Sequence, residues 1–122
     1  MKMKHLSREI VEKNYGVHKG KPFYAPLLEF MTSGPVVLIV VKGKDAINVV
    51  RKMLGATNSS EALPGTIRGD YGLSNRYNLV HGSDSLDSAA KEISVFFTDD
   101  EIIEVLNIDS DLIVANVDGD IV

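Results

Sequence analysis

Pro35-Val-Val-Leu-Ile-Val-Val41 is the longest apolar run in the sequence. From Val36 onward it consists of β-branched and aliphatic residues that do not alternate with polar ones, which is typical of a strand buried on both faces. The run is too short to span a bilayer. We therefore predict that residues 36–41 form a strand at the centre of a globular core.

Two helices are predicted before this strand. Ser7 can cap a first helix that ends near residue 16, and Leu6 is placed to pack on Val11 as a hydrophobic staple. Pro22 opens a second helix, which Gly34 and the proline after it stop.

The chain after the strand alternates between helical patterns and polar segments. Residues 45–54 carry apolar side chains at helical spacing, and Gly55 ends this third helix. Residues 56–77 are rich in Gly, Asn, Ser and Pro, and loops of this length are usually functional or disordered. We predict a short strand at residues 78–81 and an amphipathic helix from Leu86 to Phe97.

The carboxyl end carries one more helix signal and a strand signal. Thr98-Asp-Asp-Glu101 fits the capping box of a further helix. Residues 111–122 are β-branched and contain the turn signal Asp118-Gly119, so this stretch is predicted to be a strand.

Composition limits the class of protein. A chain of 122 residues suits one compact domain, and 44% hydrophobic with 25% charged residues is typical of soluble globular proteins. The absence of cysteine excludes disulfides and thiolate metal sites. The first residues, MKMKH, lack the apolar stretch of a secretory signal, so we expect a cytoplasmic location and no membrane association. A net charge of -4 gives no broad attraction to nucleic acid, so any polyanion site must come from a local cluster of cations.

Such a cluster is predicted from three stretches at loops or element ends: residues 51–58, 64–70 and 78–85. They contain Arg51 and Arg68, whose planar guanidinium groups pair bidentately with phosphate oxygens, together with threonines and one histidine. This set suits a polyphosphate ligand, although no glycine-rich Walker loop is present.

His81-Gly-Ser-Asp-Ser85, preceded by Asn78, resembles the active-site signature of the nucleoside diphosphate kinase family, and residues 64–70 resemble its phosphate-binding loop. Tyr15 and residues 21–24, 33–37 and 51–58 are also similar in order and spacing, so the resemblance runs from about residue 4 to residue 97.

The resemblance implies a cytoplasmic transferase of nucleotide metabolism. His81 would take the γ-phosphoryl group from a nucleoside triphosphate and pass it to a nucleoside diphosphate through phosphohistidine. Independently, a neutral imidazole is a competent nucleophile near pH 7. Glu92 and Ser83 match the positions that support the histidine, and Tyr15 matches a tyrosine close to it.

The resemblance also implies the nucleotide contacts and the assembly. The contacts come from Arg51, Thr57 and Arg68 at phosphate oxygens, Asn78 at the ribose hydroxyl and Phe23 at the base. Mg²⁺ would arrive on the nucleotide phosphates, with no metal site built from protein ligands alone. The expected fold is α+β, a ferredoxin-like α/β sandwich with an antiparallel sheet, in one domain over residues 1–122, and the chain would form a homo-oligomer.

The match departs from the family at its amino end. Family members begin with a strand carrying Lys-Pro-Asp-Gly, whereas this chain opens near the end of their second strand, so the catalytic lysine has no counterpart there. Residues 113–119 resemble the missing strand, with Asn116 and Val117 where lysine and proline would stand. We therefore expect residues 107–122 to supply a replacement strand or a tail. Asn75 and Arg76 also differ from the family pattern, which would alter base affinity.

Two alternatives stand beside the kinase interpretation. One is a catalytically weak or inactive nucleotide-binding or structural subunit that lost turnover with the missing lysine. The other is that each residue has an ordinary structural role: a hydrogen-bonded His81, Arg51 complementing a helix dipole, Arg68 as a loop surface charge, Phe23 in the core and Glu92 on a solvated face.

Overall fold

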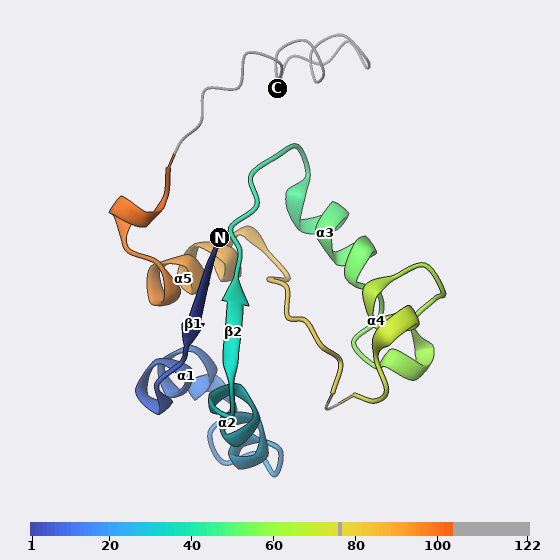
Figure 1. Cartoon of the computed structure of the whole chain (residues 1–122), viewed down its shortest axis with the longest axis horizontal. Helices are drawn as coiled ribbons and strands as arrows, with labels where there is room; N and C mark the ends of the chain where they lie inside the picture. The colour runs from blue at the N-terminus through green and yellow to red at the C-terminus, as the bar shows by residue number, and fades with distance from the viewer. Residues whose placement is uncertain (76, 104–122) are drawn as a thin grey trace, which may run out of the picture.

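The computed structural model describes residues 1–75 and 77–103, and Figure 1 shows how their helices and strands are arranged. Within these ranges β1 (Lys2–His5) and β2 (Pro35–Leu38) form a two-stranded antiparallel sheet. Lys2 is paired with Leu38 and His5 with Pro35. The local pattern did not predict β1, because its Lys-Met-Lys-His sequence contains two lysines, which are depleted in strands, although the family resemblance places the start of the chain near the end of a strand.

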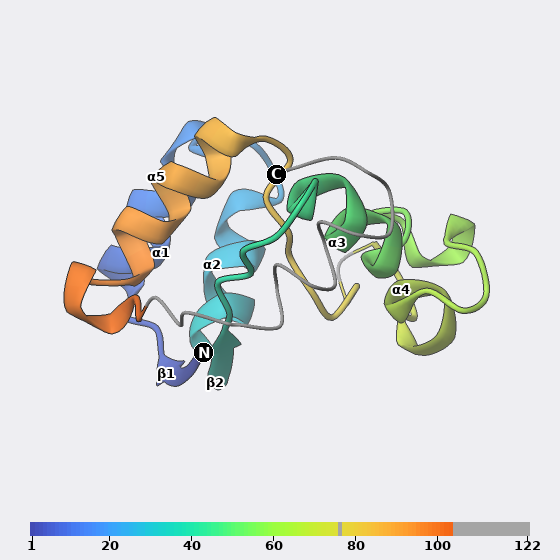
Figure 2. The same ribbon diagram turned by 90° about the horizontal axis from the view of Figure 1, so that it is seen from above.

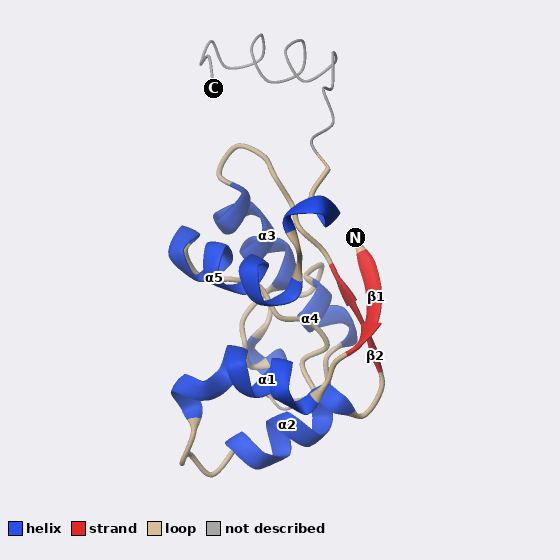
Figure 3. Cartoon of the chain, turned by 90° about the vertical axis from the view of Figure 1, so that its left-hand side faces the viewer, coloured by secondary structure: helices blue, strands red, loops and turns tan. Residues whose placement is uncertain are grey.

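A layer of three helices lies against the sheet. α1 (Arg8–Tyr15) and α2 (Tyr24–Thr32) form a hairpin through the 3-10 turn η1 (Gly16–His18), and α5 (Leu86–Phe96) packs on α1. Figure 3 shows these helices on one side of the two strands.

The core between these layers is small. Leu6, Val11 and Leu28 are its buried residues. Because Leu6 and Val11 belong to the same buried cluster, the predicted staple packing is confirmed. The predicted cap is confirmed as well, since the Ser7 hydroxyl accepts a hydrogen bond from the backbone N–H of Ile10 at 3.3 Å.

The second half of the fold is built from α3 (Ala46–Leu54) and α4 (Ile67–Tyr71). Figures 1 and 2 both place these two helices together, on the far side of β2 from α1 and α5. Gly55 ends α3 with a φ of 83°, as the glycine stop predicted. Residues 56–77, predicted to be one long loop, contain α4 and the 3-10 turn η2 (Ser59–Glu61).

The predicted central strand is only partly correct. β2 ends at Leu38 instead of residue 41, and its side chains alternate between exposed and half-buried. Val37, Ile39 and Val41 are 52%, 60% and 56% exposed. Among the described residues β2 pairs with β1 alone, so no second strand covers its other edge or extends its ladder.

Residues 78–81 do not form the predicted strand. They join no sheet in the described part of the chain, and they turn tightly at Leu79, which has a φ of 71°, where the backbone N–H of Val80 donates to the carbonyl of Asn78 at 2.9 Å. Local pattern alone predicts a strand here, whereas a strand also needs a partner.

Two helix boundaries also differ from the sequence prediction. α2 begins at Tyr24, two residues after Pro22. The capping box of Thr98 and Glu101 is present, but it opens a 3-10 turn, η3 (Asp99–Glu101), after which Ile102 and Ile103 are not helical.

The α+β class and the antiparallel pairing agree with the prediction. The predicted replacement strand, with Asn116 and Val117, lies outside the described residues, as does Arg76. None of the helices in the described ranges has both the length and the apolar character required of a membrane span.

Candidate active site

His81 contacts a carboxylate that a serine hydroxyl also binds. Its Nε2 lies 2.7 Å from Oε1 of Glu92, and the Ser83 hydroxyl donates to the other oxygen, Oε2, at 2.5 Å. The side chain of His81 is 50% exposed and that of Glu92 is 20% exposed. The carboxylate is therefore held on both oxygens, while the imidazole keeps one open side.

α1 and α5 carry the side chains that surround His81. Ser85 caps α5, the helix that carries Glu92, by accepting from the backbone N–H of Ser88 at 3.1 Å. Tyr15, the last residue of α1, meets the His81 ring edge-on, with centroids 6.1 Å apart and planes at 74°. Burial, followed by the nearby charge of Glu92, raises the pKa of the Tyr15 phenol above its ordinary value.

Arg68 lies buried in α4, with 6% of its surface exposed. Its Nη1 donates to the carbonyl of Gly55 at 2.9 Å and its Nη2 donates to the carbonyl of Val80 at 2.7 Å. Burial, followed by the charge of Arg51, lowers the pKa of its guanidinium. Its buried Nε has no hydrogen-bond partner within the described structure.

Arg51, in the last turn of α3, binds the residue that follows His81 in the chain. Its Nη1 donates to the carbonyl of Gly82 at 3.2 Å. Arg68 and Arg51 therefore bind the carbonyls immediately before and after His81, and the structure brings all three predicted residues together. Arg68 is not the loop surface charge that the structural alternative described.

The remaining predicted residues fall into two places. Asn78 and Thr57 are joined, since Nδ2 of Asn78 donates to the Thr57 carbonyl at 3.0 Å. Phe23 lies just before α2 with 48% of its surface exposed, so it is not the core residue of the structural alternative. Its ring contacts are with His18 and Lys21, to which the sequence analysis gave no role in the site.

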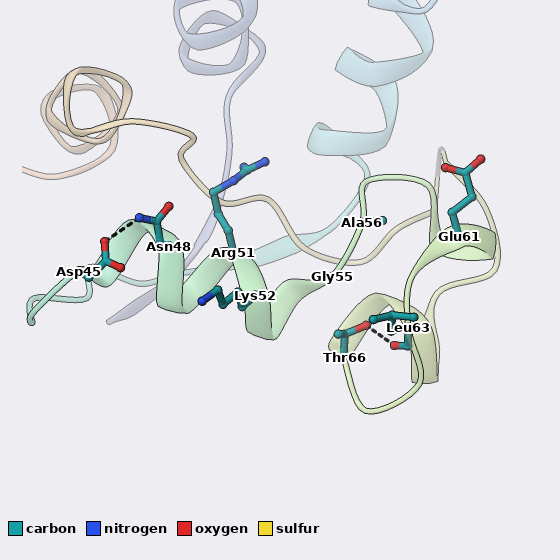
Figure 4. Close-up of a pocket in the computed structure, with 9 residues that line it drawn as sticks. All are labelled: Asp45, Asn48, Arg51, Lys52, Gly55, Ala56, Glu61, Leu63 and Thr66. Carbon is teal, nitrogen blue, oxygen red and sulfur yellow. Dashed lines mark hydrogen bonds between the residues drawn. The ribbon is translucent and has the colours of Figure 1, made fainter.

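An open depression of about 660 Å³ adjoins the site along α3. Figure 4 shows the residues that line it, which are Asp45, Asn48, Arg51, Lys52, Gly55, Ala56, Glu61, Leu63 and Thr66. Of these residues, Arg51 also donates a hydrogen bond to Gly82, the residue that follows His81. The depression therefore continues from the candidate site but does not enclose His81.

A family model described as "Nucleoside diphosphate kinase" matches residues 1–102 of this chain. The nucleoside diphosphate kinase of Archaeoglobus fulgidus is 55% identical over 113 residues, which cover 93% of this chain and 75% of that protein. The Staphylothermus marinus protein of the same name is 57% identical over 104 residues, covering 85% and 74% of the two chains.

Solved structures agree with these sequence relatives. A halophilic nucleoside diphosphate kinase from Halobacterium salinarum, in complex with CDP, has a TM-score of 0.86 at 42% identity and covers 91% of this chain and 74% of that one. A family protein from Babesia bovis has a TM-score of 0.87 at 35% identity, with coverages of 92% and 76%. The predicted fold class is thereby confirmed.

Proposed function

This chain belongs to the nucleoside diphosphate kinase family, and from that premise we propose that it transfers a γ-phosphoryl group between nucleotides through phosphohistidine on His81. The observation that carries the proposal is the contact of His81 Nε2 with a carboxylate that Ser83 also holds. A carboxylate that accepts from two donors keeps the proton on Nε2, so Nδ1 retains the lone pair needed for attack.

The transfer takes two displacements. In the first, the Nδ1 lone pair bonds to the γ-phosphorus, and the bond from that phosphorus to the bridging oxygen breaks with its electrons leaving on the nucleoside diphosphate. In the second, a terminal oxygen of an acceptor diphosphate attacks the same phosphorus, and the phosphorus–nitrogen bond breaks to return neutral His81. Glu92 stabilises the positive charge on the imidazole in both steps.

Arg51 and Arg68 are suited to bind the phosphates. Each guanidinium has five N–H donors, and the hydrogen bonds to Gly82, Gly55 and Val80 use only part of them. The Nε of Arg68 is buried, so the donors left for a phosphate oxygen are the remaining N–H groups on its two Nη atoms. Two cations beside His81 would neutralise the negative charge that spreads over the transferring group.

The rest of the nucleotide would be held by side chains that tolerate different bases. Asn78 would bond the ribose hydroxyl, Thr57 a phosphate oxygen, and Phe23 would stack on the base. Stacking accepts any base because every base has a π-face.

Mg²⁺ would reach the site on the nucleotide. Its ligands would be phosphate oxygens and water, as is usual for Mg²⁺ at phosphate sites. Bound there, it would supply charge neutralisation at the transferring phosphate.

The protein would also form a homo-oligomer. The apolar side chains of Val37, Ile39 and Val41, each more than half exposed along and beyond β2, support this because such a row is usually covered by a partner.

Labelling with γ-³²P-ATP tests the proposal. Wild type and the control His5→Ala are expected to gain acid-labile label and to pass it to a second nucleoside diphosphate, whereas His81→Ala gains none. Retained ADP binding without label in the wild type would favour the alternative, a nucleotide-binding subunit without turnover. Label that persists in His81→Ala would place the phosphoryl group elsewhere.

A further inference from the structure

A tight turn precedes Phe23. Residues His18 to Lys21 form a type II β-turn, in which the backbone N–H of Lys21 donates to the carbonyl of His18 at 3.0 Å. Lys19 has φ −55° and ψ 132°, and Gly20 has a φ of 89°, the left-handed value that this turn requires at its third position. The turn therefore brings the side chains of its first and last residues to the same place.

Those two side chains meet on the Phe23 ring. Lys21 Nζ lies 3.3 Å from His18 Nδ1 and 5.7 Å from the centroid of the ring, over its face. The His18 ring is tilted by 58° against Phe23, with centroids 5.4 Å apart. One face of Phe23 is thus backed by a cation that the histidine holds, while the residue remains half exposed.

We propose that Lys21, held by His18, is a positioning residue that fixes the Phe23 ring so that its opposite face is presented to the nucleotide base. The inference rests on the proposed function, in which Phe23 stacks on the base. A ring that is already held by a cation–π contact loses less freedom when a base stacks on it, so the contact improves binding without touching the base.

This arrangement makes a specific prediction about which ligands depend on Lys21. The ammonium acts through the ring, so its contribution should appear for ligands that carry a base and vanish for a polyphosphate that carries none. It should also be similar for different bases, since the stacked face does not read hydrogen-bonding groups.

The test compares three variants of the full chain. Lys21→Met keeps the length of the side chain and removes its charge, Lys21→Arg keeps a cation that can lie over the ring, and Lys19→Met removes one charge from the same turn. Dissociation constants are measured for ADP, GDP and inorganic tripolyphosphate, and KM and kcat for phosphoryl transfer.

Lys21→Met is expected to weaken ADP and GDP binding by about two- to fivefold, the size of an exposed cation–π contact, and to leave tripolyphosphate binding unchanged. KM should rise with kcat unaltered, and Lys21→Arg and Lys19→Met should match wild type.

An equal loss for tripolyphosphate would mean that Lys21 binds phosphate, and no loss for any ligand would mean that the ring needs no support. Either result overturns the inference. A wild type that binds nucleotides without turnover would instead refute the proposed function, and the binding comparison would still judge the role of Lys21.

Discussion

Arg68 donates from Nη2 to the carbonyl oxygen of Val80 at 2.7 Å, one residue before His81. The same guanidinium binds the carbonyl of Gly55 through Nη1, so one buried cation ties α4 to the end of α3 and to the segment that carries the histidine. It therefore shapes the candidate site.

Arg68→Lys should lower both stability and activity. A single ammonium cannot reproduce the planar fork that reaches two carbonyls, so at least one buried acceptor loses its partner, at a cost of about 1–3 kcal/mol. Urea unfolding at a fixed protein concentration measures the change. Arg8→Lys is the matched control, because Arg8 pairs with Glu12 on an exposed surface and its replacement should cost less than about 0.5 kcal/mol. Equal stability of the two variants would contradict the anchoring role.

The parts of the fold that the sequence predicted are those with local causes. Ser7 caps α1 through a hydrogen bond to a residue three positions away, and Gly55 ends α3 through its own backbone angles. Each of these signals is complete within one turn of the chain. For this reason α1, α2, α3 and α5 could be placed to within about two residues, whereas α4 was missed.

The predictions that were wrong concern features that depend on residues far away in the sequence. Whether residues 36–41 are covered is decided by neighbouring strands, and residues 78–81 lack a ladder partner among the described residues. The burial of Arg68 likewise follows from Gly55 and Val80, which are 13 and 12 positions away, so loop composition suggested a surface charge instead. Periodicity also gave no reason to join Glu92 with His81. Only the family resemblance did so.

Glu92→Gln should slow the formation of phosphohistidine by about a hundredfold. The amide is a weaker acceptor, and its NH₂ can donate to Nε2 and so favour the tautomer whose proton is on Nδ1, where it blocks attack. Rapid-quench labelling with γ-³²P-ATP measures the rate, and ADP affinity should be unchanged. Glu12→Gln, on the exposed face of α1, should label like wild type. An unchanged rate in Glu92→Gln would show that the carboxylate does not set the tautomer.

The free energy of unfolding should fall at alkaline pH because of Tyr15. Its pKa is raised in the folded protein, so above about pH 10, the ordinary value for tyrosine, the unfolded chain releases a proton that the folded chain still holds. Its contribution is therefore fully present below that pH and is lost as the pH rises toward the folded pKa. Tyr15→Phe should flatten the decline in a series of urea unfolding curves, whereas Tyr71→Phe, at an exposed position, should leave it unchanged. A steeper decline in Tyr15→Phe would contradict the sign of the shift.

Gly69→Ala should destabilise α4 and its neighbours. A Cβ at this position would lie 2.0 Å from the carbonyl oxygen of Leu63, a backbone atom that cannot turn aside as a side chain can. The resulting overpacking is expected to cost about 1–3 kcal/mol and to displace the adjacent Arg68. Gly43→Ala is the control, since a Cβ there meets nothing within 4 Å. Thermal unfolding compares the two, and similar midpoints would show that α4 relaxes freely.

Ile39→Lys should weaken self-association without unfolding the subunit. Ile39 is 60% exposed just beyond β2, so a lysine meets water in the separate chain but would be desolvated if a second copy covered this row. Analytical ultracentrifugation across a dilution series should show a lower mass than wild type, with an unchanged far-UV spectrum. Leu73→Lys replaces an apolar residue that is 89% exposed elsewhere and should keep the wild-type mass. A wild type that is monomeric at all concentrations would exclude the homo-oligomer. If Leu73→Lys alone dissociated, the contact between copies would lie in residues 56–77 instead of along β2.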